Sequence, residues 1–224
     1  MSNKTIVVTG LGNPGEEFKN TPHNSGFRVV DKILKDLRSK TDLKPEELLL
    51  REIFNEPVWL HVRDRNLSGW YSCQEWTYGT LDNKVEVYFL TPLLFMNLSG
   101  HGIEKFLIVE GPRLNLTKDM LVIHDDLDIP MGEALFRASG GPGNNNGCKD
   151  IDSTLNLNGK WNRIKVGTGT HFKIYDKVGY VLAPIAESNK DRMADGESSA
   201  AKIALRWITQ NYIEGNKPND ESSS

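Results

Sequence analysis

The turn that follows the first apolar segment reads Gly10-Leu11-Gly12-Asn13-Pro14-Gly15. It comes directly after the apolar run Ile6-Val7-Val8 and is followed by Thr21-Pro22-His23-Asn24-Ser25-Gly26. Three glycines and a proline favour a tight turn whose backbone can approach a ligand closely, as happens where a strand of an α/β protein ends. The stretch therefore predicts a strand, a tight turn and a helix, with Asn13 and His23 near the strand end.

The same turn has two other interpretations. It is compatible with an ordinary strand-to-helix connection, because short Gly-x-Gly strings recur by chance. It is also compatible with phosphate binding in a small-molecule enzyme, although the acidic ribose partner of the dinucleotide fingerprint is missing from the sequence.

Short apolar segments alternate with amphipathic segments along the chain, which is typical of an α/β layer protein. Strands are predicted at 5–11, 70–80, 84–90, 120–123, 133–138 and 163–169, with the second and third paired. Helices are predicted at 24–39, capped by Asn24 or Ser25, at 97–109, from about 147, and at 200–211. The expected fold is a single three-layer α/β/α domain with a mixed, mainly parallel twisted sheet.

Length and composition limit the fold and the compartment. A chain of 224 residues with 38% hydrophobic residues can bury one core, so we expect one domain over residues 1–213. Residues 44–66 form a charged, irregular insertion in this interpretation, and residues 214–224 a disordered tail. Cys73 and Cys148 are too few for a disulfide framework and wrongly spaced for a metal site, which favours a reducing compartment.

No stretch approaches the roughly 18 apolar residues of a membrane span, and the N-terminus has no apolar secretory core. We therefore expect a cytoplasmic protein without a membrane partner, with the mitochondrial matrix as the alternative. The formal net charge is −3, yet residues 137–177 contain seven basic and three acidic residues, a local charge of +4. This segment suits contact with a few phosphates, and it is equally compatible with an ordinary solvated surface.

Polar residues gather at one edge of the predicted sheet. Asn13 follows the first strand, Asp125 follows the strand that ends at Ile123, and Asn97 and Asn146 stand at or before helix starts. Ligands of open α/β sheets bind outside the carboxyl ends of the strands, so we predict a pocket lined by asparagines. Each asparagine is alternatively a turn or cap residue, Asn97 above all.

His23 is the natural candidate for a general base, because neutral imidazole accepts a proton near neutral pH. A carboxylate such as Asp125 would fix the ring tautomer; alternatively, His23 merely caps the following helix. Asp125, Asp126 and Asp128 are also compatible with a hard divalent cation, but the run lacks the further ligands and the spacing of a calcium loop. We expect no metal and favour Asp125 as the partner of His23.

Five ordered segments resemble peptidyl-tRNA hydrolase of the bacterial type. They are residues 10–26, 91–100, 123–132, 140–151 and 163–169, within a resemblance that runs from about Ile6 to about Trp207. The resemblance implies hydrolysis of the ester between tRNA and a peptide, without metal or cofactor, by a monomer. A serine or cysteine nucleophile is not expected, because Gly-x-Ser-x-Gly is absent and neither cysteine has an adjacent histidine.

The resemblance also implies roles for single residues. The implied catalytic residues are His23, Asp125 and Asn13. The implied substrate-binding residues are Phe18, Met96, Asn97, Asn145 and Asn146, although core packing explains a methionine equally well. The expected tRNA-binding residues are Arg137, which aligns with a phosphate-binding lysine of the family, Lys149 of the basic segment, and Arg163 and Lys165 as substitutes for the clamp charge that is missing.

The chain departs from the family pattern where tRNA should be held. Pro22 replaces an arginine, and in the glycine-rich loop Pro142 and Asn145 replace histidines while Asn144 replaces a glycine. Two lysines of a phosphate clamp align with Leu135 and Arg137, so one charge of the clamp is lost. The sequence therefore predicts a hydrolase in which His23 activates water directly. The alternative is a catalytically weak or inactive RNA-binding protein on the same scaffold.

Overall fold

The structure is a computed structural model that describes residues 4–41, 56–80, 83–112, 114–170 and 173–215. Within these ranges the chain forms one seven-stranded sheet in the order β2-β3-β4-β1-β5-β7-β6. The strands are β1 (Lys4–Gly10), β2 (Val58–Asp64), β3 (Tyr71–Gly79), β4 (Lys84–Pro92), β5 (Met120–Pro130), β6 (Ala134–Arg137) and β7 (Asn162–Gly169).

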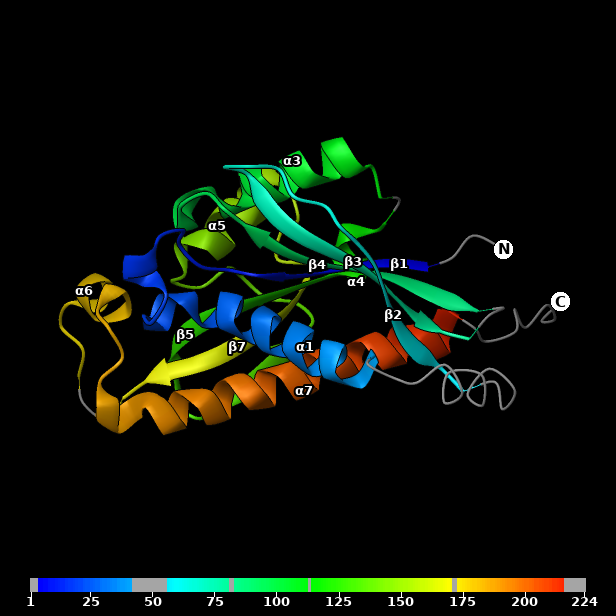
Figure 1. The fold of residues 1–224 in the computed structure, drawn as a ribbon. Helices are drawn as coiled ribbons and strands as arrows, with labels where there is room; N and C mark the ends of the chain where they lie inside the picture. The colour runs from blue at the N-terminus through cyan, green and yellow to red at the C-terminus, as the bar shows by residue number, and fades with distance from the viewer. Residues whose placement is uncertain (1–3, 42–55, 81–82, 113, 171–172, 216–224) are drawn as a thin grey trace, which may run out of the picture.

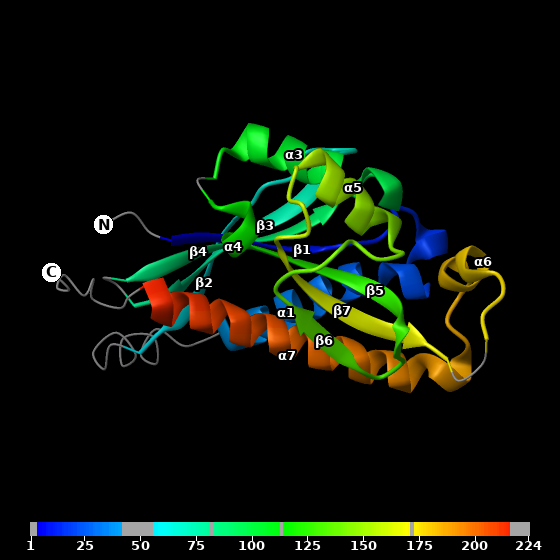
Figure 2. The same cartoon turned by 180° about the vertical axis from the view of Figure 1, so that it is seen from behind.

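Helices cover both faces of the sheet. The α-helices are α1 (Ser25–Thr41), α3 (Ser99–Glu110), α4 (Leu116–Asp119), α5 (Asn146–Thr154), α6 (Lys177–Leu182) and α7 (Lys190–Gly215). Short 3-10 turns are η1 (Glu16–Phe18), η2 (Pro22–Asn24), η3 (Met96–Leu98) and η4 (Glu187–Asn189). Figure 1 shows α3, α4 and α5 on one face and α1 and α7 on the other, and Figure 2 shows the same layers from behind. The predicted α/β/α fold class is confirmed.

The sheet is parallel at its centre and antiparallel towards both edges. β1 pairs in parallel with β4 and with β5, and β5 pairs in parallel with β7. The pairings β2–β3, β3–β4 and β6–β7 are antiparallel. The carboxyl ends of β4, β1 and β5 therefore lie side by side at one end of the sheet. This end is at the left in Figure 1, where α6 also lies.

The core has one apolar cluster on each face of the sheet. Neighbouring side chains of a strand point to opposite faces, so Ile6 and Val8 pack with α1 and α7. Val7 lies in the other cluster, with Phe106 of α3 and Ile151 of α5. Burial on both faces explains why the first strand is a continuous apolar run rather than an alternating one.

Glycines let α1 approach the ends of β1 and β5. A Cβ on Gly26 would lie 2.3 Å from the carbonyl oxygen of Ile123, and a Cβ on Gly10 would lie 2.2 Å from that of Gly26. The backbone amide of Leu11 also donates to the Ile123 carbonyl at 2.9 Å. Close packing, rather than a phosphate, therefore accounts for these glycines. The same packing brings the start of α1 beside the residues that follow Ile123.

Several predicted boundaries are wrong. β2 lies in the stretch expected to be irregular; its residues are half-buried or exposed, because it is an edge strand held by pairing with β3 rather than by burial. The last helix begins at Lys190 instead of Ala200, since Met193 and Glu197 are buried in an otherwise polar segment. The insertion prediction at 44–55 and the tail prediction at 216–224 lie outside the described residues. None of the described helices is long and apolar enough to cross a bilayer.

Candidate active site

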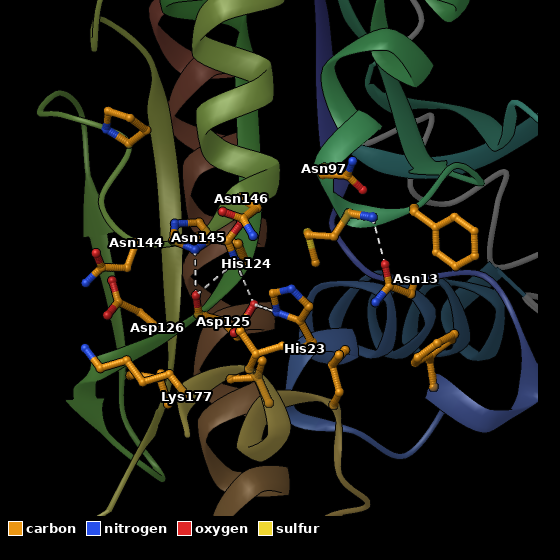
Figure 3. Close-up of a pocket in the computed structure, with 18 of the residues that line it drawn as sticks. Asn13, His23, Asn97, His124, Asp125, Asp126, Asn144, Asn145, Asn146 and Lys177 are labelled. Atoms are coloured by element: carbon orange, nitrogen blue, oxygen red, sulfur yellow. Dashed lines mark hydrogen bonds and ion pairs between the residues drawn. The ribbon is translucent and has the colours of Figure 1, made fainter. Parts of the chain in front are cut away.

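A pocket of about 550 Å³ lies at the carboxyl edge of the central strands (Figure 3). Its walls come from the turns after β1 and β4, the distal half of β5, the loop before α5, and α6. All the residues that the sequence predicted as catalytic or substrate-binding line this pocket: Asn13, Phe18, His23, Met96, Asn97, Asp125, Asn145 and Asn146.

The centre of the pocket is a histidine–aspartate pair. The Nδ1 atom of His23, in η2, lies 2.8 Å from Oδ1 of Asp125, in β5. An ionised carboxylate can only accept, so Nδ1 donates this hydrogen bond and carries the proton. In the neutral ring the Nε2 atom then has the free lone pair, and this ring lines the pocket.

Asp125 is buried and held at three further points. Its Oδ1 atom accepts a second hydrogen bond, from Nδ2 of Asn145 at 2.7 Å. Its backbone carbonyl accepts from Nδ1 of His124 at 2.8 Å and, at 3.5 Å, from Nδ2 of Asn145. Burial lowers the pKa of His124 despite the nearby Asp125 charge, which favours a neutral ring. The carboxylate is thus held between His23 and Asn145, while the bonds to the carbonyl hold the backbone of Asp125.

Asn13 is fixed equally firmly. Its Oδ1 atom accepts from the backbone amide of Met96 at 2.7 Å, which joins the turn after β1 to η3. The side chain of Asn24 bonds both backbone groups of Asn13, at 2.9 Å each. Asn24 therefore does not cap α1 as predicted, and the hydroxyl of Ser25 has no hydrogen-bond partner within the described ranges.

Asn145, Asn146 and Asn97 differ in how far hydrogen bonds hold their side chains. Asn145 caps α5, because its Oδ1 atom accepts from the backbone amide of Cys148 at 3.1 Å. Asn146 is exposed, and its Oδ1 atom lies 3.5 Å from Nζ of Lys149. Asn97 is also exposed, and neither η3 nor α3 has a side-chain cap, so the alternative interpretation of Asn97 as a helix cap does not hold.

The pocket has an apolar wall that the sequence indicated only in part. Phe18 meets Phe95 edge-on, with 6.4 Å between ring centres, and Met96 is buried beside them. The facing wall comes from α6 and was missed: Lys177, Val178, Val181 and Leu182. Two signals could have revealed this helix. Its apolar residues recur at three and four positions, and Asp176 caps it by accepting from the Gly179 amide at 2.8 Å.

Charges around the pocket are paired or peripheral. Burial acts to raise the pKa of Asp126, but the hydrogen bonds from Lys165 Nζ, at 2.7 Å, and from the Asp128 backbone amide, together with the Lys165 charge, outweigh burial and the pKa is lowered. Within the described ranges, no three histidine, cysteine or acidic side chains converge as metal ligands would. Burial raises the pKa of the Cys73 and Cys148 thiols well above the usual range, which makes both poor nucleophiles.

The predicted tRNA contacts lie in different environments. Arg137 and Lys149 are exposed, whereas Lys165 is engaged with Asp126. Arg163 is 1% exposed, its guanidinium lies 3.9 Å from the ring centre of Trp161, and it donates to the carbonyls of Gly140 and Gly141. A phosphate cannot reach a side chain buried in this way, so the prediction that Arg163 contacts tRNA is withdrawn. Its charge instead supports the glycine-rich loop.

Comparison with known proteins gives one consistent result. The family pattern described as peptidyl-tRNA hydrolase matches residues 7–221. The peptidyl-tRNA hydrolase of Koribacter versatilis is 32% identical over 203 residues, which cover 89% of this chain and 86% of the relative. That of Haemophilus influenzae is 33% identical over 188 residues, with 84% and 81% covered. The crystal structure of the Acinetobacter baumannii enzyme has the same fold, with a TM-score of 0.70 at 20% identity, covering 96% of this chain and 94% of its own.

Proposed function

This chain belongs to the peptidyl-tRNA hydrolase family, and we propose that it hydrolyses the ester between tRNA and a peptide or N-blocked aminoacyl group through water that His23 activates. The observation that carries the proposal is the bond from Nδ1 of His23 to Asp125, which leaves Nε2 as the proton acceptor in the pocket. Such a reaction returns tRNA from stalled translation.

The proposed reaction has two proton transfers. His23 Nε2 takes a proton from water while the water oxygen attacks the ester carbonyl carbon, and Asp125 stabilises the imidazolium that forms. The bond between that carbon and the ribose oxygen then breaks, and the imidazolium returns its proton to the departing oxygen. The immediate products are a peptide carboxylic acid, which loses its remaining proton to solvent, and tRNA with a free ribose hydroxyl. A positioned base of this kind contributes about 10²–10⁴-fold to the rate.

The asparagines supply neutral contacts to water and peptide. Because Oδ1 of Asn13 is engaged with the Met96 amide, its Nδ2 atom is the free donor, and we assign it to orienting the attacking water. Asn97 and Asn146, both exposed in the pocket, are assigned to the peptide backbone. Phe18 and Met96 provide the apolar wall against which the acyl group rests.

The tRNA lies, in this proposal, against the exposed basic residues near the pocket. Arg137 on β6 and Lys149 on α5 are assigned to phosphates of the tRNA. Lys165 is assigned to a phosphate as well, and its ammonium group shares this contact with Asp126. The protein is proposed to act as a monomer in a reducing compartment, the cytoplasm or the mitochondrial matrix. Its cysteines are unpaired, which agrees with such a compartment. Light scattering after size-exclusion chromatography tests the monomer.

Single-turnover release of tRNA from N-acetyl-aminoacyl-tRNA tests the proposed function. The native protein and His23→Ala are compared at concentrations where each binds the RNA to the same extent. We expect rapid release that falls at least 100-fold in the variant. Binding without release by the native protein would contradict the hydrolase and favour the RNA-binding alternative. Equal release by both proteins would remove His23 from the mechanism.

A further inference from the structure

We infer that Asn145 is a positioning residue of this site, whose side-chain amide holds the Asp125 carboxylate in the direction that supports His23. The inference deepens the proposed function and rests on it, because it concerns the aspartate behind the proposed base. It replaces the sequence-based expectation that Asn145 contacts the substrate.

The first argument is that one carboxylate oxygen receives two donors. Oδ1 of Asp125 accepts from His23 Nδ1 at 2.8 Å and from Asn145 Nδ2 at 2.7 Å. Figure 3 shows His23 and Asn145 on either side of this carboxylate. The two donors come from separate elements, η2 and the loop before α5, and Asp125 comes from β5. Without Asn145, one side of the carboxylate would lose its fixed partner and the side chain could rotate.

The second argument is that the Asn145 amide is engaged at both ends. While Nδ2 donates to Asp125, Oδ1 accepts from the Cys148 backbone amide at 3.1 Å and so begins α5. That helix is anchored by the fully buried Cys148 and Ile151. The position of the amide is therefore set by a packed helix, unlike that of the exposed Asn97 and Asn146.

The third argument concerns charge. The other titratable groups around Asp125 are His124, kept neutral by burial, Asp126, paired with Lys165, and the buried Cys148 thiol, while Asp128 also lines the pocket and Lys177 lies farther out on α6. A neutral amide draws negative charge density of Asp125 away from His23 without adding a titrating group of its own. While the carboxylate still faces His23, removing the amide therefore strengthens the attraction of Asp125 for the imidazolium; the rotation that it permits lowers the share of molecules in which the pair is aligned.

The test compares variants that keep the helix cap. Asn145→Ser retains a capping oxygen and is uncharged, but it is too short to donate to Asp125. Asn145→Asp also caps the helix and brings a second negative charge to Asp125. The matched control is Asn115→Ser, because Asn115 caps α4 through the Thr117 amide at 3.0 Å, outside the pocket. Circular dichroism confirms that each variant is folded, and kcat and KM are measured from pH 5 to 9.

For Asn145→Ser we expect kcat to fall about tenfold, with KM within twofold of the native value. The midpoint of the acid limb of kcat should move up by about half a pH unit, and further in Asn145→Asp. Asn115→Ser should match the native protein. An unchanged kcat and midpoint would make Asn145 a helix cap only, and a raised KM at native kcat would restore the substrate contact; either result overturns the inference. These outcomes differ from a failure of the proposed function, in which release of tRNA by the native protein would not depend on His23.

Discussion

Arg28 donates from Nε to Oε1 of Glu197 at 2.8 Å, and the pair joins α1 to α7. The Nη1 atom of Arg28 also donates to the carbonyls of Lys19 and Thr21, at 2.8 Å each. These two carbonyls belong to the segment that leads into His23. The C-terminal helix therefore supports the proposed base through a single guanidinium group.

The Arg28 pair gives the first prediction, a pH-dependent loss of stability. Burial raises the pKa of Glu197, although the charge and hydrogen bond of Arg28 oppose the rise. A raised pKa means that protonated Glu197 favours the folded state, and that this contribution is lost as pH rises through the folded-state value. In Arg28→Ala the opposing charge is gone, so the free energy of unfolding should fall by about 2 kcal/mol at pH 8 and by clearly less at pH 5.

Urea unfolding of Arg28→Ala at both pH values measures this difference. The double variant Arg28→Ala with Glu197→Gln has no buried carboxylate, so its deficit relative to the native protein should not grow between pH 5 and pH 8. A deficit in Arg28→Ala that is larger at pH 5 would reverse the sign and contradict the assignment.

The second prediction concerns the tautomer of His23. In Asp125→Asn the amide can donate to Nδ1, which would shift the ring proton to Nε2 and remove the proposed acceptor. We expect the single-turnover rate to fall about 10²–10⁴-fold while tRNA affinity stays within threefold. Filter binding and product release, measured on the same preparation, check both parts. A variant that keeps a tenth of the native rate would show that the carboxylate is not needed to orient the ring.

The third prediction concerns the close approach at the start of α1. A Cβ on Gly26 would lie 2.3 Å from the Ile123 carbonyl and 2.4 Å from the Leu11 amide nitrogen, and neither backbone atom can move freely. Gly26→Ala should therefore destabilise the protein by about 3 kcal/mol or more. Gly141→Ala is the control, since nothing lies within 4 Å of its added Cβ, and its effect should stay within about 0.5 kcal/mol. Chemical unfolding of both variants measures the two changes in the free energy of unfolding.

The fourth prediction separates exposed from buried basic residues. Arg137→Ala should weaken tRNA binding and lower the slope of log K against log salt concentration by about 0.7–0.9, as expected for one lost phosphate contact. Arg163→Met should leave that slope unchanged and instead lower stability, because the Gly140 and Gly141 carbonyls lose their donors. Titrations between 50 and 200 mM salt distinguish the two cases. A reduced slope for Arg163→Met would show that this side chain reaches the RNA.

The sequence predicted the parts of the site that follow directly from strand ends. His23, Asp125 and Asn13 stand just after β1 or in β5, and parallel pairing of these strands brings their ends together. The sequence could not predict the environment of Arg163, because a count of charges along the chain carries no information about burial. The prediction also missed α6, although its apolar spacing and its Asp176 cap are visible in the sequence, and it missed the polar start of α7.

The sequence also could not predict which partner each asparagine side chain bonds. Asn13, Asn24 and Asn145 have the same functional group but different partners. The side chain of Asn13 accepts from the Met96 amide in η3, and that of Asn24 bonds the backbone of Asn13. The side chain of Asn145 joins Asp125 to the start of α5. Which donor meets which acceptor depends on elements far apart in the sequence. Only the folded chain shows that Asn145 is engaged at both ends while Asn97 and Asn146 are exposed.

The distance along the chain between His23 and Asp125, 102 residues, has a consequence for biosynthesis. While the ribosome makes this protein, the growing chain is itself a peptide esterified to tRNA, the very bond that the finished protein cleaves. The N-terminal half supplies the histidine but not its carboxylate, and Asn145 and α6 follow later still. A nascent chain that ends before Asp125 has the histidine without its carboxylate, and so lacks the pair on which the proposed reaction depends.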